Sequence, residues 1–236
     1  MLKDKQHECN RQAAAFGKLL ARPMQPHLKS VPIGLQSLSL DSDRDALLYV
    51  PKNYQVDKPA PLVLMLHGAG GNANAGLAPF LRQADEAGLI LLAPASHLKT
   101  WDMLYGEYGA DITFINQALT ETFSRYAIDP AHIAIEGFSD GASYGLSVGV
   151  TNSDLFSRII AFSPGFMAPK KQLGKPQIFI SHGKRDNVLP IARCSRQIVP
   201  QLQLAGYDVV YQEFNGFHNV PTAIANSALH WLNHQN

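Results

Sequence analysis

A serine at the centre of a glycine-flanked segment is the strongest candidate for chemistry in this sequence. Residues 132–136 form a strand-like run, and the next five residues read Gly-Phe-Ser-Asp-Gly before a segment of helical periodicity begins. In a G-x-S-x-G turn between a strand and a helix, the serine backbone is strained and its hydroxyl is exposed at the head of the helix. Side chains two positions to either side would collide, and Gly137 and Gly141 have none. The pattern therefore predicts that Ser139 is a nucleophile.

A serine nucleophile of this kind needs two partners. Its hydroxyl is weakly nucleophilic at neutral pH and requires an adjacent base, which a third group orients. In this motif the acid and then the histidine follow the serine along the chain, each after a strand. Asp186 comes just after the apolar run at residues 177–181, and His218 comes just after the run at residues 208–214. We therefore predict that Asp186 orients His218 and that His218 accepts the proton of Ser139.

Other carboxylates fit the role of the acid less well. Asp186 itself could instead cap the helix that follows it, or pair with Arg185. Asp111 precedes Ser139 in the sequence, and Asp208 lies at the start of a strand, on the wrong edge of the predicted sheet. Each of these two would require an unusual topology, so Asp186 is the predicted acid.

Two histidines compete for the role of the base. His218 could be an ordinary surface-loop histidine, and His182 lies close to the predicted acid in sequence. His182 precedes Asp186 on the same loop, however, whereas the motif requires the base to follow the acid. We therefore predict that His218 is the base and that His182 lies beside the site.

A glycine-rich turn follows the apolar run at residues 62–66 and reads His-Gly-Ala-Gly-Gly. It matches the turn that supplies one oxyanion-hole N–H beside a serine nucleophile of this type. A developing oxyanion needs donors that are already in place, and the backbone N–H groups of Ala69 and Asp140 fit that role. We expect His67 to brace the turn, and we place His67 and Gly68 at the substrate pocket.

The same glycines also fit a dinucleotide-binding fingerprint, because residues 68–73 read Gly-Ala-Gly-Gly-Asn-Ala. That fingerprint expects an acidic residue at the end of the next strand, where residues 93–96 read Ala-Pro-Ala-Ser. A phosphate-binding loop would need a Lys-Ser or Lys-Thr pair after the glycines, and none follows. The sequence therefore predicts neither a nicotinamide site nor a phosphate-binding loop at these glycines.

Trp101 and Glu136 are notable for other reasons. Trp101 follows the fourth strand-like run, and its loop would lie on the same rim as the Ser139 turn. Its ring could form a wall of the substrate pocket, or it could be a buried aromatic that packs the loop. Glu136 lies in a central strand, where we expect a buried, paired carboxylate whose partner the sequence does not identify.

Short runs rich in β-branched residues alternate with longer segments of helical periodicity along most of the chain. This alternation is typical of an α/β sheet with crossover helices. We expect eight strands, at residues 35–40, 46–50, 62–66, 89–93, 132–136, 158–162, 177–181 and 208–214. We expect helices at residues 77–87, 112–126, 142–150, 191–205 and 221–233. The first two strands should form an antiparallel hairpin with its turn at residues 41–43, and the later strands should run parallel with helices on both faces.

The chain is predicted to contain one α/β domain at residues 31–236, preceded by an N-terminal appendage at residues 1–30. The segment is polar and contains two prolines, and we expect it to be an appendage or a short helix packed on the domain. The connection at residues 164–176 is short, although domains of this kind often insert a helical lid there. We therefore expect an open, unlidded site.

The composition favours a small, weakly charged partner. The chain has 236 residues, of which 17% are charged, and a formal net charge of +1, so no strong field attracts nucleic acid or anionic lipid. No apolar run approaches the ~20 residues that span a bilayer. Cys9 and Cys194 lack the spacing of a zinc site, and the N-terminal segment lacks the apolar core of a signal peptide. We expect a cytoplasmic protein with free thiols and no metal site.

Five short segments together resemble the phospholipase/carboxylesterase family of α/β-hydrolases. They are Leu66-His67-Gly68, Thr100-Trp101-Asp102, residues 137–142, residues 181–183 with Asp186, and Gly216-Phe217-His218. The sequence is also similar to polyhydroxybutyrate depolymerase-like and feruloyl esterase-like proteins. The resemblance implies the α/β-hydrolase fold and hydrolysis of carboxylic esters through an acyl-serine intermediate, without a metal or cofactor.

Two other functions remain open at this point. The same three side chains could serve a thioesterase or a peptidase, because specificity depends on the shape of the pocket. A hydrolase fold without activity could instead serve as a binding module. The presence of a candidate for every catalytic role argues against an inactive module, and ester hydrolysis is the default among the enzymes. We therefore expect a carboxylesterase that acts on small to medium esters. The sequence identifies neither the physiological ester nor the oligomeric state.

Overall fold

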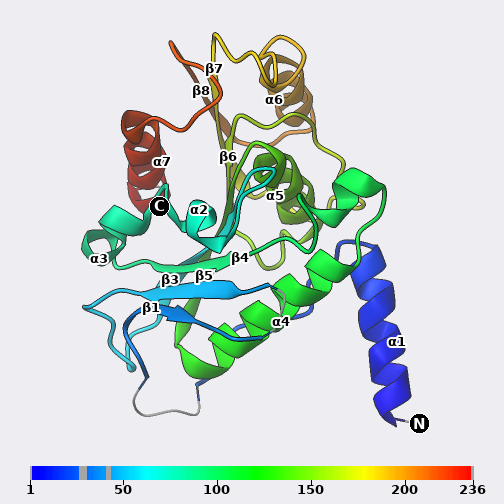
Figure 1. Cartoon of the computed structure of the whole chain (residues 1–236), viewed down its shortest axis with the longest axis vertical. Coiled ribbons are helices and arrows are strands. Elements are labelled where there is room, and N and C mark those ends of the chain that lie inside the picture. Colours follow the sequence, from blue (N-terminus) through cyan, green and yellow to red (C-terminus); the bar gives the residue numbers. More distant parts are fainter. Residues whose placement is uncertain (1, 27–30, 41–43, 235–236) are drawn as a thin grey trace.

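The chain folds around one eight-stranded sheet (Figure 1). The computed structural model describes residues 2–26, 31–40 and 44–234. The strands are β1 (Gly34–Ser37), β2 (Ala46–Val50), β3 (Ala60–Leu66), β4 (Ile90–Pro94), β5 (Ile128–Phe138), β6 (Arg158–Phe162), β7 (Gln177–Gly183) and β8 (Val209–Phe214). Their order across the sheet is β1-β2-β4-β3-β5-β6-β7-β8.

The sheet is mostly parallel, as the alternation of strands and helices predicted. β1 pairs with β2 and β2 pairs with β4 in antiparallel directions, whereas the other neighbouring pairs run parallel. The predicted N-terminal hairpin is confirmed, and its predicted turn at residues 41–43 lies outside the described residues. Because β5, β7 and β8 are parallel, their carboxyl ends meet at one edge of the sheet, where ligands of open α/β sheets bind.

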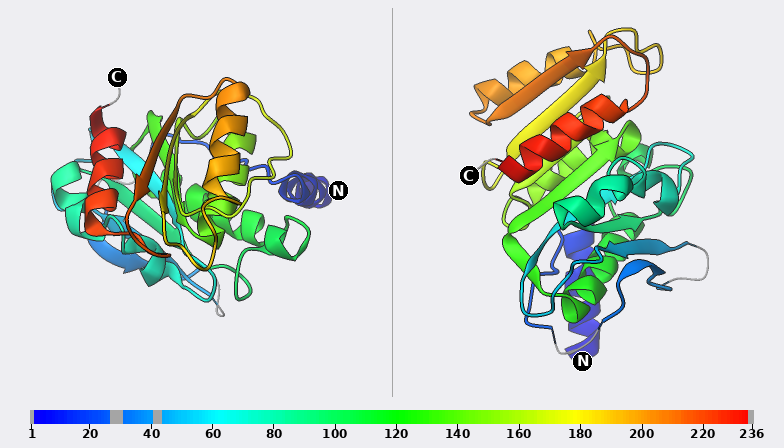
Figure 2. Two further views of the ribbon diagram at one scale, coloured as in Figure 1. Left: turned by 90° about the horizontal axis from the view of Figure 1, so that it is seen from above. Right: turned by 90° about the vertical axis from the view of Figure 1, so that its left-hand side faces the viewer.

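Helices cover both faces of the sheet (Figure 2). They are α1 (Leu2–Ala15), α2 (Ala73–Leu77), α3 (Ala84–Ala87), α4 (Ala110–Arg125), α5 (Asp140–Thr151), α6 (Ser195–Leu204) and α7 (Thr222–His234). α4, α5 and α6 share a core with Leu64 and Ile135, whereas α2, α3 and α7 share the other core with Val63 and Ile160. Successive side chains of a strand point to opposite faces, which explains this division. In the described part of the chain, no helix is long and apolar enough to cross a membrane.

Two helices differ from the predicted ones. The single helix predicted at residues 77–87 is divided into α2, a 3₁₀ turn at Leu81–Gln83 and α3. Pro79 has no amide hydrogen with which to continue the hydrogen bonding of α2. The helix predicted from residue 191 begins only at Ser195, so the chain first makes a turn after β7.

The connection between β6 and β7, which the structure describes throughout, contains no helix, as predicted for an unlidded site. It lies along α5, where three hydroxyls spaced four residues apart hold it. Each hydroxyl donates to the carbonyl four residues earlier in the helix and accepts a backbone N–H from the connection. The pairs are Ser143 with Gly165, Ser147 with Ala168 and Thr151 with Lys170. These bonds fix the connection against the helix.

The N-terminal segment is bound to the domain beyond α1, which lies beside α4 (Figure 1). The backbone N–H of Leu19 donates to Asn152 Oδ1 (2.8 Å), and Leu19 is fully buried. The next two residues, Leu20 and Ala21, both donate to Asn116 Oδ1. The predicted domain boundary at residue 30 lies outside the described residues.

Candidate active site

A strained turn places Ser139 at the carboxyl edge of the sheet. Ser139 is the single residue between β5 and α5, and its backbone has φ 56° and ψ −119°. A positive φ is uncommon for a residue other than glycine and marks strain that the surrounding structure must hold. A Cβ at Gly137 would lie 2.2 Å from the carbonyl oxygen of Gly141, and a Cβ at Gly141 would lie 2.3 Å from that of Leu66. Close backbone approach therefore requires both glycines of the motif.

Ser139, His218 and Asp186 form a continuous chain of hydrogen bonds. His218 Nε2 lies 2.8 Å from Ser139 Oγ, and His218 Nδ1 lies 2.6 Å from Asp186 Oδ2. A carboxylate only accepts hydrogen bonds, so Nδ1 carries the proton and Nε2 presents its lone pair to the serine hydroxyl. The three residues follow β5, β7 and β8, whose ends the parallel sheet brings together. This arrangement allows His218 to take the hydroxyl proton as Ser139 attacks an electrophile.

Both carboxylate oxygens of Asp186 accept hydrogen bonds. The Asp186 carboxylate is fully buried, whereas the His218 side chain is 13% exposed. Asp186 Oδ1 accepts the backbone N–H groups of Val188 (2.9 Å) and Leu189 (2.8 Å). Burial raises the pKa of Asp186, but the hydrogen bonds from His218 and the two backbone N–H groups outweigh it, and the net pKa lies below its usual value. Asp186 therefore remains ionised beside the imidazole.

His182 lies on the other side of the acid from His218. Its Nε2 lies 2.8 Å from the Leu189 carbonyl and 3.2 Å from Asp186 Oδ2, and its Nδ1 lies 2.7 Å from Ser195 Oγ. Because a carbonyl only accepts, Nε2 donates to Leu189 and Nδ1 accepts from Ser195. Burial lowers the pKa of His182, which favours the neutral ring. His182 thus supports Asp186 and the loop that carries it. Among the described residues, the imidazole that is hydrogen-bonded to Ser139 is that of His218.

The two other candidate acids have partners elsewhere. Asp111 Oδ1 lies 2.7 Å from Arg44 Nη1, and the carboxylate also accepts two backbone N–H groups. Asp208 Oδ2 accepts from Gln177 Nε2 at 3.0 Å. Neither carboxylate is hydrogen-bonded to a histidine ring in the described part of the chain, whereas Asp186 contacts the rings of two histidines.

The glycine-rich turn after β3 passes beside the nucleophile. A Cβ at Gly68 would lie 3.3 Å from Ser139 Cβ. Ala69 is exposed, and Asp140 is the first residue of α5, where backbone N–H groups have no acceptor inside the helix. Among the described residues, no acceptor takes a hydrogen bond from the backbone N–H of Ala69 or Asp140. The Asp140 N–H lies at the positive end of the α5 dipole, which favours negative charge there.

Two residues predicted at the substrate pocket are buried instead. His67 is 2% exposed and Trp101 is 0% exposed. Burial favours the other readings of the two residues, a histidine that braces the turn and an aromatic that packs the loop, over a place in a pocket wall. His67 Nδ1 lies 2.7 Å from the Gly68 carbonyl, and His67 Nε2 accepts the backbone N–H of Ser96 (2.9 Å). The Trp101 ring stacks on Tyr144 with centroids 5.1 Å apart. Both rings support the turn from the interior of the protein. The sequence does not predict this, because the direction of a loop side chain depends on partners that local sequence does not reveal.

Glu136 has no hydrogen-bond partner among the residues that the structure describes, so the expectation of a paired carboxylate is wrong for this part of the chain. The side chain is fully buried, and among the described residues neither of its carboxylate oxygens has a hydrogen-bond partner. The strand register places Glu136 between Met65 and Ile160, on the face of the sheet that α2 and α7 cover. Burial raises the pKa of Glu136 well above its ordinary value, which favours the protonated carboxyl group in the folded protein.

Replacing Glu136 with methionine is expected to stabilise the protein, because the change removes an unpartnered carboxyl group from an apolar layer at similar volume. The free energy of unfolding should rise by about 1–3 kcal/mol, the usual cost of an unsatisfied buried polar group. The folded-state pKa of Glu136 lies above the unfolded value of about 4.3. Between these two pKa values the unfolded chain has lost the proton that the folded chain keeps, so this glutamate costs more stability as pH rises.

Urea unfolding measured from pH 5 to pH 9 checks this expectation. The gap in unfolding free energy between Glu136→Met and the wild type should widen with pH until the folded-state pKa is passed. A gap that is constant with pH, or a variant less stable than the wild type, would contradict a protonated and unpartnered Glu136.

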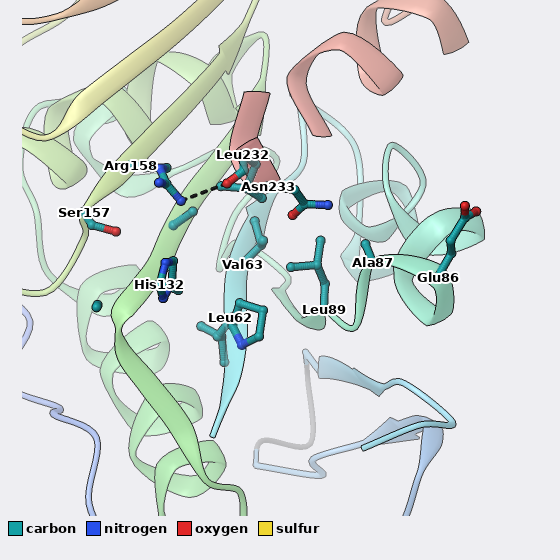
Figure 3. A pocket seen from close by; sticks show the side chains of 13 residues that line it. Leu62, Val63, Glu86, Ala87, Leu89, His132, Ser157, Arg158, Leu232 and Asn233 are labelled. Atoms are coloured by element: carbon teal, nitrogen blue, oxygen red, sulfur yellow. Dashed lines mark hydrogen bonds between the residues drawn. The ribbon is translucent and has the colours of Figure 1, made fainter. Parts of the chain in front are cut away.

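A cavity of about 690 Å³ lies at the opposite edge of the sheet (Figure 3). Its walls come from the amino-terminal parts of β3, β5 and β6 and from the end of α7. Two of its polar side chains are engaged within the protein: Arg158 Nη1 donates to the Leu232 carbonyl (2.8 Å), and His132 Nδ1 lies 2.7 Å from Asp129 Oδ2. Ser139 follows the other end of β5, so this cavity is not part of the candidate active site.

Within the ranges that the structure describes, no group of three or more His, Cys, Asp or Glu side chains is placed to hold a metal ion. Cys9 is exposed and Cys194 is buried, and both are free thiols. The groups gathered at the carboxyl edge are therefore a serine hydroxyl, an imidazole ring, a carboxylate and two backbone N–H groups without an acceptor among the described residues.

Comparison with known sequences finds esterases. A family model described as Phospholipase/Carboxylesterase matches residues 110–234. The chain is similar to a protein named probable feruloyl esterase C from Aspergillus oryzae, with 27% identity over 157 residues. That match covers 63% of this chain and 57% of the relative, so the chain spans little more than half of the relative's length.

Comparison with solved structures concerns the fold. The structure is similar to the crystal structure of esterase PE8, with a TM-score of 0.64 and 22% identity, over 85% of this chain and 98% of that chain. It is also similar to a phospholipase/carboxylesterase from Dyadobacter fermentans, with a TM-score of 0.61 and 19% identity, over 87% and 99% of the two chains. These likenesses confirm the predicted α/β-hydrolase fold.

Proposed function

The chain belongs to the phospholipase/carboxylesterase family, and from this membership we propose that it is a serine esterase that hydrolyses carboxylic esters. The observation that carries the proposal is the hydrogen-bonded chain from Ser139 through His218 to Asp186 at the end of a strained turn. A serine aligned with a base that a carboxylate orients is an activated nucleophile. In this proposal the three residues are a catalytic triad.

Acylation begins when Ser139 Oγ attacks the carbonyl carbon of the ester. His218 Nε2 takes the hydroxyl proton, and the carbonyl oxygen becomes an oxyanion that accepts hydrogen bonds from the backbone N–H groups of Ala69 and Asp140. The tetrahedral intermediate collapses, the bond to the alcohol oxygen breaks, and His218 returns the proton to the leaving alcohol. The product of this half-reaction is an acyl-Ser139 ester.

Deacylation repeats these steps with water as the nucleophile. His218 takes a proton from water as the water oxygen attacks the acyl carbon. It then gives the proton to Ser139 Oγ as the carboxylic acid product leaves. Asp186 stays ionised throughout and stabilises the imidazolium that forms in each step, in keeping with its lowered pKa. The reaction uses the chain's own side chains and backbone and requires no cofactor.

The proposed substrates are small to medium esters that reach Ser139 from solvent. The connection between β6 and β7 is bound along α5, so no helical segment from it has to move before a substrate enters. The relative named a feruloyl esterase makes feruloyl esters a class to test beside simple acyl esters. Pocket shape decides among such substrates.

Labelling with a fluorophosphonate probe, followed by peptide mapping, tests the proposed function. An activated serine attacks the phosphorus of the probe, so we expect the label on Ser139 in the wild type. His218→Ala should slow labelling by orders of magnitude, because it removes the base. His132→Ala is a matched control, since His132 also pairs with an aspartate but is exposed at the other edge of the sheet. A label on another serine, or no label as for an inactive binding module, would refute the proposal.

A further inference from the structure

The loop that follows β4 holds the turn that carries the Ala69 donor. Three hydrogen bonds join the loop to the turn. They run from Ser96 N–H to His67 Nε2 (2.9 Å), from Trp101 Nε1–H to the His67 carbonyl (2.9 Å) and from Gly70 N–H to the Lys99 carbonyl (2.6 Å). Ala69 lies between the bonded residues, so the orientation of its backbone N–H is fixed from both sides.

Thr100 joins the same loop to the second donor. Thr100 Oγ1 lies 2.8 Å from Asp140 Oδ2 and is the donor, because a carboxylate only accepts. Asp140 also supplies a free backbone N–H at the first position of α5. One loop therefore contacts both turns, and it sets the position of one N–H donor relative to the other.

The contact with Thr100 also fixes the position of the Asp140 carboxylate. Asp140 carries its carboxylate on the residue whose N–H faces the developing oxyanion in the proposed reaction. A carboxylate turned towards that oxyanion would oppose it, because like charges repel strongly where water is partly excluded. The hydrogen bond from Thr100 holds the Asp140 carboxylate on the side of the loop.

The loop after β4 is itself fixed by contacts with the core, as it must be if it is to position the two N–H donors. Trp101 is fully buried and stacks on Tyr144. The buried Asp111 carboxylate accepts the backbone N–H groups of His97 (2.6 Å) and Asp102 (2.7 Å), one on each side of Thr100. Thr100 is thereby attached to a rigid support on both sides.

We propose that Thr100 is a positioning residue for the oxyanion hole. It aligns the backbone N–H of Asp140 with that of Ala69 and keeps the Asp140 carboxylate away from the oxyanion. The inference rests on the proposed function, because an oxyanion forms only if the chain performs acyl transfer. Since the oxyanion exists in the transition state and not in the bound ester, Thr100 should affect kcat more than KM.

Thr100→Val tests this role, because it removes the hydroxyl at nearly the same volume, and Thr100→Ser is the matched control that keeps it. With p-nitrophenyl acetate, the valine variant should lose about 10-fold in kcat, as expected for one hydrogen bond to a charged group, with KM nearly unchanged. The serine variant should retain kcat close to the wild-type value. The melting temperatures of both variants should stay close to that of the wild type.

Two further measurements separate positioning from a general structural effect. A trifluoromethyl ketone forms a tetrahedral adduct that carries an oxyanion, so its affinity should fall by the same factor as kcat/KM in the valine variant. In an Asp140→Asn background, Thr100→Val should cost less, because no carboxylate charge remains to be held away.

The outcomes distinguish this inference from the proposed function. If the fluorophosphonate labels Ser139 and Thr100→Val has wild-type kcat, or if the valine and serine variants lose equally, the role of Thr100 is refuted alone. A loss of kcat matched by a large fall in melting temperature would also refute it, because destabilisation would then explain the rate. If Ser139 is not labelled in the wild type, the proposed function and the role of Thr100 fail together.

Discussion

Changing Ser139 to alanine is expected to abolish ester hydrolysis while the protein stays folded. Without Oγ no acyl-enzyme forms, and loss of the nucleophile from such a triad costs about 10⁶-fold in kcat. The fold should persist because, within the described ranges, Ser139 Oγ makes a single hydrogen bond, to His218, and alanine tolerates the positive φ as well as serine does. Initial rates with a p-nitrophenyl ester, together with the melting temperature, measure both parts of this expectation.

Ser163 provides the matched control for that substitution. It follows β6 with φ 52°, is fully buried, and has a hydroxyl with no hydrogen-bond partner among the described residues. Ser163→Ala therefore removes the same atom from a similar backbone next to the same edge of the sheet. Its kcat should remain close to the wild-type value, because no step of the proposed reaction uses this hydroxyl. Equal rates in Ser139→Ala and Ser163→Ala would remove Ser139 from the mechanism.

The nucleophile turn could be predicted from the sequence because its geometry demands particular residues. Gly137 and Gly141 stand where a Cβ would meet backbone atoms, so the turn leaves a recognisable local pattern. Asp186 and His218 could be predicted from the order of the strands, because parallel strands deliver their following loops to one edge. Constraints of this kind come from the backbone, and the backbone is what local sequence controls most directly.

Contacts between distant loops could not be predicted in the same way. His67 and Trp101 have the residue types of a pocket wall, yet their rings face inward, because each bonds to another loop. The contact of Thr100 with Asp140 joins residues 40 positions apart, and no local spacing marks it. Glu136 was recognisable as a buried carboxylate, but a sequence pattern does not distinguish a paired carboxylate from an unpaired one.

Changing Asp186 to asparagine is expected to lower kcat by about 10⁴-fold. The carboxylate only accepts hydrogen bonds and so keeps the proton of His218 on Nδ1. An amide can donate to Nδ1 instead, and Nε2 would then carry the proton and could not accept that of Ser139. The imidazolium of the transition state would also lose a neighbouring negative charge. Steady-state rates, normalised by melting curves to the folded fraction, measure this loss.

Asp111→Asn is the control that separates the chemistry of Asp186 from its burial. Asp111 is also a buried carboxylate that accepts two backbone N–H groups, but its charged partner is Arg44. Removing one member of this buried pair should lower the free energy of unfolding by about 3 kcal/mol. The kcat of the folded fraction should fall far less than in Asp186→Asn, because Asp111 acts on the reaction only through the loop that holds Thr100. Asp186→Asn should lose less stability, because its amide oxygen can still accept the backbone N–H of Leu189. A large loss of kcat in Asp111→Asn and a small one in Asp186→Asn would assign the acid to Asp111, which precedes Ser139 in the chain.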